Sequence, residues 1–375
     1  MAGDRPLRFG ALLASLLLAA CPGETPPAGA PPSEGSADPL DGIAAGYVHL
    51  TLAMGAHDAH YVDAYFGPPA WADEGLALYP TPGSIRAAAQ GLLERLGAVA
   101  PPQDDLVRRR AAGLHKRLIA LQARIDIVSG VPLSFDEEAR LVYDAVAPDH
   151  DAADFEAVLA QLDALLPGAG DLQARARAFA DRFVIPPDRL EAVFAAAIDE
   201  CRRRTLQHIA LPPEEDFTLE YVTDKPWSGY NWFQGDAFSL IQINVDLPHR
   251  IDRAIDLGCH EGYPGHHTHA TLLERELYEG RGWVEFSVYP LFGPQSLLSE
   301  GSANYGIDLA FPVRERLDFE RATLFPLAGL DPSQAAAYHR YLDLRRQLSY
   351  ARNEAARDYL DGRISRGAAV EWLQR

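Results

Sequence analysis

Apolar residues recur at three- and four-residue spacing through much of the chain, beginning at Asp41 and continuing to about Leu211. This spacing places them on one face of an α-helix, so the pattern predicts a series of amphipathic helices. The predicted helices cover residues 84–99, 105–128, 151–166 and 187–209. Ser134 and Glu137 have the spacing of a capping box and predict the start of another helix. Since each helix must bury its apolar face against other elements, we expect a mainly α fold.

The periodicity changes after Pro213. Apolar Phe217, Leu219 and Tyr221 alternate with polar residues, which is the period of a β-strand. A turn-rich stretch over 226–235 separates them from a second alternating run, which contains Ile241, Ile243 and Val245. We therefore expect a small β-element at about 217–246, after which the helical pattern resumes from about residue 250.

The first forty residues have the composition of a targeting segment. Arg5 and Arg8 precede an apolar run over 9–20, which is too short to span a bilayer as a helix. The run ends in Ala19-Ala20-Cys21, a junction that resembles the lipobox of bacterial lipoproteins, in which the cysteine is lipidated. We expect a lipoprotein signal peptide at 1–20 and a lipid-anchored, Pro/Gly-rich tether at 21–40. The alternative is an ordinary signal peptide, with Cys21 as an incidental thiol.

These segments predict an envelope protein with one folded body. The body would cover 41–375, with an N-terminal helical part at 41–212 and a second part at 213–375. It would face the periplasm or the exterior, bound to a membrane through Cys21. Two cysteines remain in the body, Cys201 and Cys259, and we expect buried thiols and not a disulfide, because free cysteine is commonly buried.

The charge balance excludes some partners. Asp and Glu total 53 and Lys and Arg total 34, so the formal net charge is −19. A nucleic-acid partner is not expected, because affinity for phosphates comes mainly from Lys and Arg. An acidic surface around a binding cleft would favour neutral or basic substrates over acidic ones.

Histidines are concentrated between Cys259 and His269, which read C-H-E-G-Y-P-G-H-H-T-H. Metallopeptidases of the H-E-x-x-H type place two histidines four residues apart on one helix face, where both bind one zinc ion. His260 and His266 are six residues apart, which on a regular helix turns the second ring by about 240° and raises it by about 9 Å. Pro264 removes a helical hydrogen bond and Gly265 tolerates unusual dihedral angles. We therefore expect the helix to break here, so that His260 and His266 converge.

Spacing alone leaves the other ligands open. His267 competes with His266, but it lies two turns from His260 on the same helix face. Catalytic zinc needs a third protein ligand and an open position. Glu300 is a candidate, because a carboxylate within an apolar helical segment needs a partner such as a metal ion.

Together these residues resemble a bacterial family of predicted zinc peptidases, many of which are lipoproteins, with a gluzincin-like arrangement. The family signature is H-E-x-x-P-G-H-H followed by E-G-x-A-x-Y, and the matching residues are His260, Glu261, Pro264, Gly265, His266, His267, Glu300, Gly301, Ala303 and Tyr305. The resemblance implies one Zn²⁺ per chain, bound by His260, His266 and Glu300, with Glu261 as general base. It also implies a multi-helix metallopeptidase-like fold with the β-element beside the metal site.

Two further residues, Tyr305 and Asn244, are hypotheses for substrate contacts. Tyr305 would donate a hydrogen bond to the developing oxyanion, and the strand around Asn244 would bind an extended peptide by backbone pairing. The sequence thus predicts a zinc-dependent metallopeptidase, with a peptide as substrate. The alternatives are a lipoprotein binding module with a structural or vestigial metal site, and a zinc hydrolase of non-peptide amides.

Overall fold

The chain's structure is a computed structural model that describes residues 38–375. The expected signal peptide, Cys21 and nearly all of the expected tether lie outside the described residues. The first helix, α1 (Pro39–Gly55), includes the last two residues of the expected tether. It begins there because the Asp38 side chain accepts a hydrogen bond from the Leu40 amide and because proline suits the first turn of a helix.

The expected mainly α fold with a small β-element is confirmed, since the structure is 65% helix and 9% strand. The other helices are α2 (Ala70–Leu78), α3 (Pro82–Gly97), α4 (Asp105–Val128), α5 (Phe135–Tyr143), α6 (Ala152–Leu165), α7 (Leu172–Ala180), α8 (Leu190–Thr205), α9 (Asp252–Leu257), α10 (His266–Leu273), α11 (Pro294–Ala310), α12 (Val313–Phe319), α13 (Phe325–Ala328), α14 (Ala335–Leu348), α15 (Ala351–Leu360) and α16 (Arg366–Gln374). The strands are β1 (Val62–Tyr65), β2 (Asp216–Val222), β3 (Gly229–Gly235), β4 (Phe238–Asn244) and β5 (Val288–Pro290).

The predicted helices agree with the structure to different degrees. Helix α4 has the predicted bounds, and Ser134 and Glu137 form the expected capping box at the start of α5. The helix expected over 187–209 is shorter, because residues 187–189 form a 3₁₀ turn and the α-helix covers only Leu190–Thr205. None of the helices within 38–375 is both long and apolar enough to cross a membrane.

The β-element is a three-stranded sheet in the order β2–β4–β3, with β2 parallel and β3 antiparallel to β4. The expectation of turns over 226–235 is wrong for most of that range, since Gly229–Gly235 is the edge strand β3. Its terminal glycines look like turn signals, but the aromatic residues between them favour a strand. A second antiparallel pair, β1 with β5, was not predicted.

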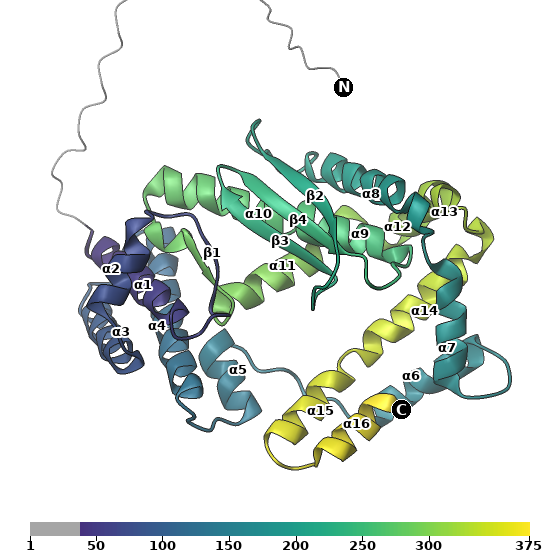
Figure 1. Ribbon diagram of the computed structural model, residues 1–375, viewed down its shortest axis with the longest axis horizontal. Helices are drawn as coiled ribbons and strands as arrows, with labels where there is room; N and C mark the ends of the chain where they lie inside the picture. Colours follow the sequence, from purple (N-terminus) through teal and green to yellow (C-terminus); the bar gives the residue numbers. More distant parts are fainter. Residues whose placement is uncertain (1–37) are drawn as a thin grey trace, which may run out of the picture. The chain divides into compact units, whose positions relative to one another are not determined.

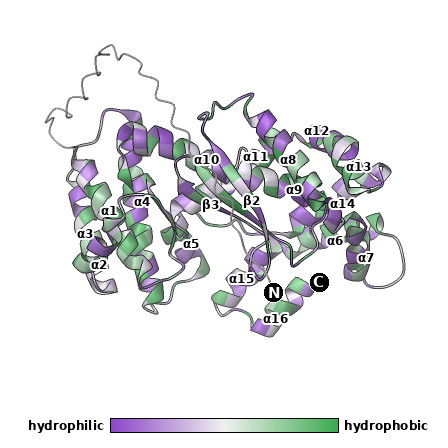
Figure 2. Cartoon of the chain, turned by 45° about the horizontal axis from the view of Figure 1, so that its top comes forward, coloured by the Kyte–Doolittle hydropathy of each residue, from purple (hydrophilic) through white to green (hydrophobic). Residues whose placement is uncertain are grey.

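Two hydrophobic cores hold these elements together. The first contains buried residues of α1, α3 and α4 together with Val288, and the second is built around α8, β4, α9 and α14. Figure 2 shows apolar and polar residues alternating around these helices, as amphipathic packing requires. In Figure 1 the sheet lies between the α1–α4 helices and α8. The residues before and after position 212 both contribute to the second core.

Candidate metal centre

The helix that carries the histidines is interrupted where Pro264 predicts a break. Helix α9 continues into a π-helical turn, Gly258–Gly262, then Tyr263 is extended and α10 begins at His266. Gly265 is required in this geometry, since an added Cβ would lie 1.8 Å from the His260 carbonyl oxygen and 2.4 Å from that of Cys259. The Gly265 amide instead donates a hydrogen bond to the Cys259 carbonyl at 2.9 Å.

The break brings His260 and His266 together, with their ring centroids 4.6 Å apart. Glu300, on α11, faces both rings: its carboxylate oxygens lie 3.4 Å from Nε2 of His260 and 3.2 Å from Nε2 of His266. One potential ligand atom from each residue lies within 4.8 Å of the other two. Two imidazoles and one carboxylate are a donor set that suits catalytic zinc, which keeps a further position open.

The surroundings of this cluster also suit a cation. Nδ1 of His266 lies 3.0 Å from the Ser299 hydroxyl, a contact that orients the ring with Nε2 toward Glu300. Hydrogen bonds from His260 and His266 hold the pKa of Glu300 well below its usual range. Burial lowers the pKa of His260, but the hydrogen bond to Glu300 and the charge of Glu261 outweigh it and raise the pKa. The Glu300 carboxylate thus favours positive charge beside it, and a bound cation would supply that charge.

Glu261 lies beside the cluster and is only 5% exposed. Burial raises the pKa of its carboxyl group, although the charges of His266 and His260 oppose the shift. Its backbone carbonyl accepts a hydrogen bond from the Asn231 amide group at 2.7 Å, and a Cβ at Gly229 would lie 3.1 Å from its Oε1. Strand β3 thus approaches the Glu261 carboxylate closely, because Gly229 has no side chain.

His267 points away from this cluster. It is fully buried, its Nε2 donates to the Glu215 carboxylate at 3.0 Å, and its Nδ1 lies 2.8 Å from the Ser239 hydroxyl. Because both ring nitrogens are engaged, His267 has no lone pair left for a metal ion. Among the described residues the geometry therefore groups His266, and not His267, with His260 and Glu300.

Asn244 does not take the position that the sequence suggested for it. Its side chain donates at 2.9 Å to the carbonyls of both Lys225 and Trp227, and its strand β4 is paired on both edges. The expectation that this strand pairs with a substrate is wrong, because β4 is the central strand and its backbone groups are already paired with β2 and β3. Asn244 instead holds the turn that leads into β3.

Tyr305 lies on α11 and lines the same pocket as the metal cluster. The residue is 63% exposed. It is accessible to a ligand, and its role toward an oxyanion stays a hypothesis.

The pocket has a volume of about 930 Å³ and is lined by β3, by the interrupted α9–α10 helix and by α11. Val288 of the first core and Leu257 and Ile307 of the second core belong to its wall, so the pocket lies between the two cores. All three cluster residues and Glu261 also line it. An extended peptide of a few residues fits a pocket of this size.

Two pocket residues near the cluster were not predicted as site residues, Asp63 on β1 and Tyr230 on β3. The Tyr230 hydroxyl donates a hydrogen bond to Asp63. Burial raises the pKa of the Asp63 carboxyl group, and the hydrogen bond from Tyr230 opposes the shift. Nothing in the local sequence indicates Asp63, because β1 reaches the pocket through its pairing with β5 and its contact with β3, both distant in the sequence.

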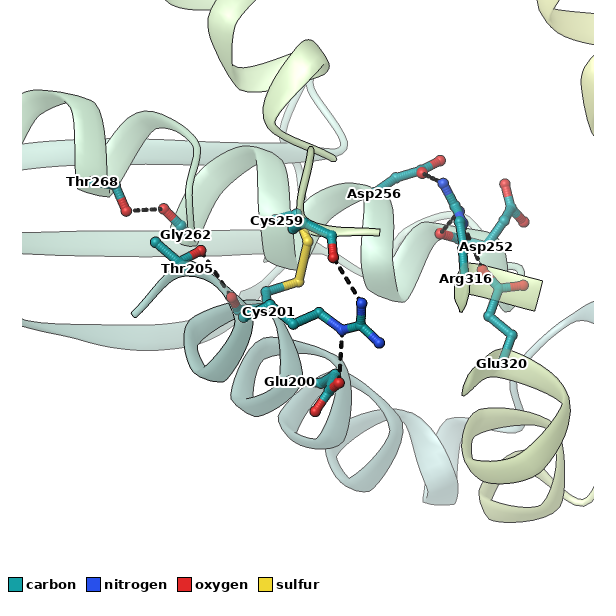
Figure 3. Close-up of a disulfide and its surroundings, with 12 residues drawn as sticks. Glu200, Cys201, Thr205, Asp252, Asp256, Cys259, Gly262, Thr268, Arg316 and Glu320 are labelled. Atoms are coloured by element: carbon teal, nitrogen blue, oxygen red, sulfur yellow. Dashed lines mark hydrogen bonds and ion pairs between the residues drawn. A yellow bond between two sulfur atoms is a disulfide. The ribbon is translucent and has the colours of Figure 1, made fainter. Parts of the chain in front are cut away.

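The expectation of two free thiols is wrong, although both cysteines are buried as predicted. Cys201 on α8 and Cys259 in the π-helical turn form a disulfide with their Cα atoms 5.5 Å apart (Figure 3). The pairing could not be deduced from the sequence, because the two residues are 58 positions apart and meet only when α8 packs against the turn. The disulfide attaches the residue before His260 to a helix of the second core.

Comparison of the chain with models of protein families, with curated proteins and with solved structures finds no match.

Proposed function

We propose that this chain is a zinc-dependent metallohydrolase, and most specifically a peptidase. The observation that carries the proposal is the convergence of His260, His266 and Glu300 within 4.8 Å, in a pocket that Glu261 also lines. His260, His266 and Glu300 would hold the ion. When bound there, zinc supplies Lewis acidity toward a carbonyl group and lowers the pKa of water.

Glu261 would take the proton from the attacking water and pass it to the leaving amine. Its burial supports this role, because a carboxyl group with a raised pKa is a better proton acceptor and donor near neutral pH. Ser299 would keep the His266 ring oriented, and Asn231 would hold the backbone of Glu261. These contacts fix the general base and the ligands relative to one another.

Strand β3 offers a way to bind an extended peptide. It is one of the two edge strands of its sheet, and several of its residues line the pocket beside Glu261. The Ser228 carbonyl accepts a hydrogen bond from the Asn244 amide on β4. Because such bonds alternate along an antiparallel pair, the backbone groups of Gly229, Asn231 and Phe233 point to the free edge. A substrate strand would pair there, which favours peptides over other amides.

The envelope location expected from residues 1–40 is part of the proposal. The disulfide supports it, since structural disulfides persist mainly in oxidising compartments outside the cytosol. Mass spectrometry of the mature N-terminus tests the anchor, because an unmodified Cys21 in the mature protein would contradict it.

The catalytic proposal is tested with Glu261→Gln in the full chain. We expect the variant to keep its zinc and to lose about 10²- to 10⁴-fold in turnover of a peptide library, which is the usual contribution of a general base. Glu276→Gln, an exposed carboxylate outside the pocket, is the matched control and keeps full activity. If wild-type protein shows no cleavage that a chelator abolishes, the binding-module alternative is favoured; cleavage of other amides alone would favour the non-peptide hydrolase.

A further inference from the structure

Two arginines from helices of the second core line the pocket, Arg253 on α9 and Arg346 on α14. Asp256 and Asp308 lie near them and line it as well, so the question is which of these charges is already engaged. Apolar and aromatic residues such as Phe66 also belong to the lining. A ligand in the pocket therefore meets both guanidinium groups and apolar side chains.

The two arginines have donors that the protein does not use. The nearest carboxylate to Arg253 is Asp256 at 3.6 Å, beyond hydrogen-bonding distance, and Arg253 otherwise donates to the Ser228 hydroxyl at 3.2 Å. The Asp256 carboxylate lies instead 2.8 Å from buried Arg316 (Figure 3). Arg346 lies 3.9 Å from Asp308 and forms no side-chain hydrogen bond within 38–375.

Arg253 lies on the same helical segment as the proposed ligands, seven residues before His260. Seven residues of helix rise about 10 Å, and an extended peptide advances about 3.3 Å per residue. The Arg253 side chain, which itself extends toward the pocket, would thus reach a group one to three residues from a bond cleaved at the cluster. Its charge also acts on the site, since it lowers the pKa of both His260 and Glu261 as a lesser contribution.

The direction of β3 indicates which end of a peptide this is. A Cβ added at Gly229, at the start of β3, would meet Leu257 and Glu261, whereas one added at Gly235, at its end, would meet Phe66. A peptide that pairs antiparallel with β3, the slightly more stable arrangement, has its carboxyl end at Gly229 and hence near Arg253. Its amino-terminal side then lies toward Gly235 and Phe66.

We propose that Arg253, assisted by Arg346, binds the C-terminal carboxylate of short peptides, so that the chain removes one to three residues from the carboxyl end of substrates with an apolar residue on the amino side of the cleaved bond. This proposal rests on the proposed peptidase function. Arginine suits the role because its planar guanidinium binds a carboxylate through two hydrogen bonds. In the reaction the C–N bond breaks, water supplies OH to the acyl carbon, and Glu261 transfers the remaining proton to the leaving amine, whose carboxylate stays on Arg253.

The test uses a library of tetrapeptides in two forms, one with a free C-terminal carboxylate and one with a C-terminal amide, and with free amino ends in both. We expect kcat/KM of the zinc-loaded chain to be at least about tenfold higher for the free acids, through a lower KM. Arg253→Gln should abolish the difference by raising KM for the acids alone, and Arg253→Lys should restore part of it. Arg250→Gln is the control, because that side chain pairs with Asp181 and does not line the pocket.

A binding measurement separates this inference from the proposed function. Zinc-loaded Glu261→Gln should bind the acids at least about tenfold more tightly than the amides in calorimetry, and the double variant Glu261→Gln/Arg253→Gln should bind both equally. Equal cleavage of acids and amides, or equal binding, would overturn the carboxylate site and leave the peptidase proposal intact. Acid-selective, Arg253-dependent binding without any cleavage would support the carboxylate site and contradict the peptidase.

Discussion

Two neighbouring histidines of this chain belong to two very different His–carboxylate regions. His266 faces Glu300, whose side chain is 54% exposed, at the wall of a large pocket. His267 faces Glu215, and both side chains are almost completely buried. The two histidine–carboxylate distances are 3.2 Å and 3.0 Å, so the pairs differ little in separation. The comparison shows that accessibility and unused hydrogen-bonding capacity, and not the residue types, distinguish a candidate ligand from a structural residue.

In the buried region, the Glu215 carboxylate and both ring nitrogens of His267 have hydrogen-bond partners. The Glu215 carboxylate accepts hydrogen bonds from His267, from the Tyr263 hydroxyl at 2.6 Å and from Arg202 at 2.6 Å. Burial by itself raises the pKa of Glu215, but these three hydrogen bonds outweigh burial and lower the pKa. The network joins the sheet, α8 and the turn before His266. We infer that this network stabilises the turn that positions His260 and His266 beside Glu300.

The largest effect is expected for His266→Ala. If His266 is a ligand, the variant should lose most of its bound zinc and all measurable peptidase activity while remaining folded, because the side chain is partly exposed and its removal leaves no buried charge. Zinc content by atomic spectroscopy and the far-ultraviolet circular dichroism spectrum check the two parts. A His266→Ala protein that retains one zinc ion would remove His266 from the site.

The second prediction concerns the turn that separates the two regions. Gly265→Ala should lose at least about tenfold in zinc affinity, since its Cβ would overlap the His260 carbonyl and must displace the turn. Gly262→Ala is the matched control, because its Cβ would meet Phe217 at an ordinary 3.6 Å. Competition with a chromogenic chelator measures both affinities. Equal zinc affinities would show that the turn can rearrange without cost to the site.

His267→Ala should act on stability and not on metal binding. Truncating a fully buried ring leaves a cavity and removes one hydrogen bond from the buried Glu215 carboxylate, which together cost about 3–5 kcal/mol, so we expect a loss of that size in the free energy of unfolding. The folded fraction should still bind zinc with the stoichiometry of the wild type. Denaturant titration and zinc analysis of the purified folded protein provide the measurement; loss of zinc with unchanged stability would reverse the roles of His266 and His267.

The smallest of these effects is expected from opening the disulfide behind the turn. The double variant Cys201→Ala/Cys259→Ala should lower the free energy of unfolding by about 2–4 kcal/mol, because the bond closes a loop of 58 residues in the unfolded chain. Zinc affinity should fall by less than in Gly265→Ala. Thermal unfolding with and without reductant checks the wild type; an unchanged midpoint on reduction would mean that α8 holds the turn without the bond.

Local features could be predicted from the sequence. The bounds of α4, the capping box of α5 and the break at Pro264-Gly265 all follow from residues within a few positions of one another. The proximity of His260 to His266 follows from the break, and so a metal cluster could be expected before any tertiary contact was known. Strand β3 was missed because its terminal glycines resemble turn residues, whereas its pairing with β4 is what makes it a strand.

The remaining features depend on contacts between distant segments. The sequence by itself determined the helical class, the interrupted helix and the candidate residues His260, Glu261, His266 and Glu300, because these rest on local backbone preferences and side-chain chemistry. Only the tertiary structure decided that Cys201 forms a disulfide with Cys259 and that the Glu215 carboxylate is hydrogen-bonded to His267. It also decided that Asp63 and Arg253 line the pocket. The physical reason is that burial and hydrogen-bond partners are set by how α8, β1 and the sheet pack around the turn, and this packing has no signature in the spacing of residues along the chain.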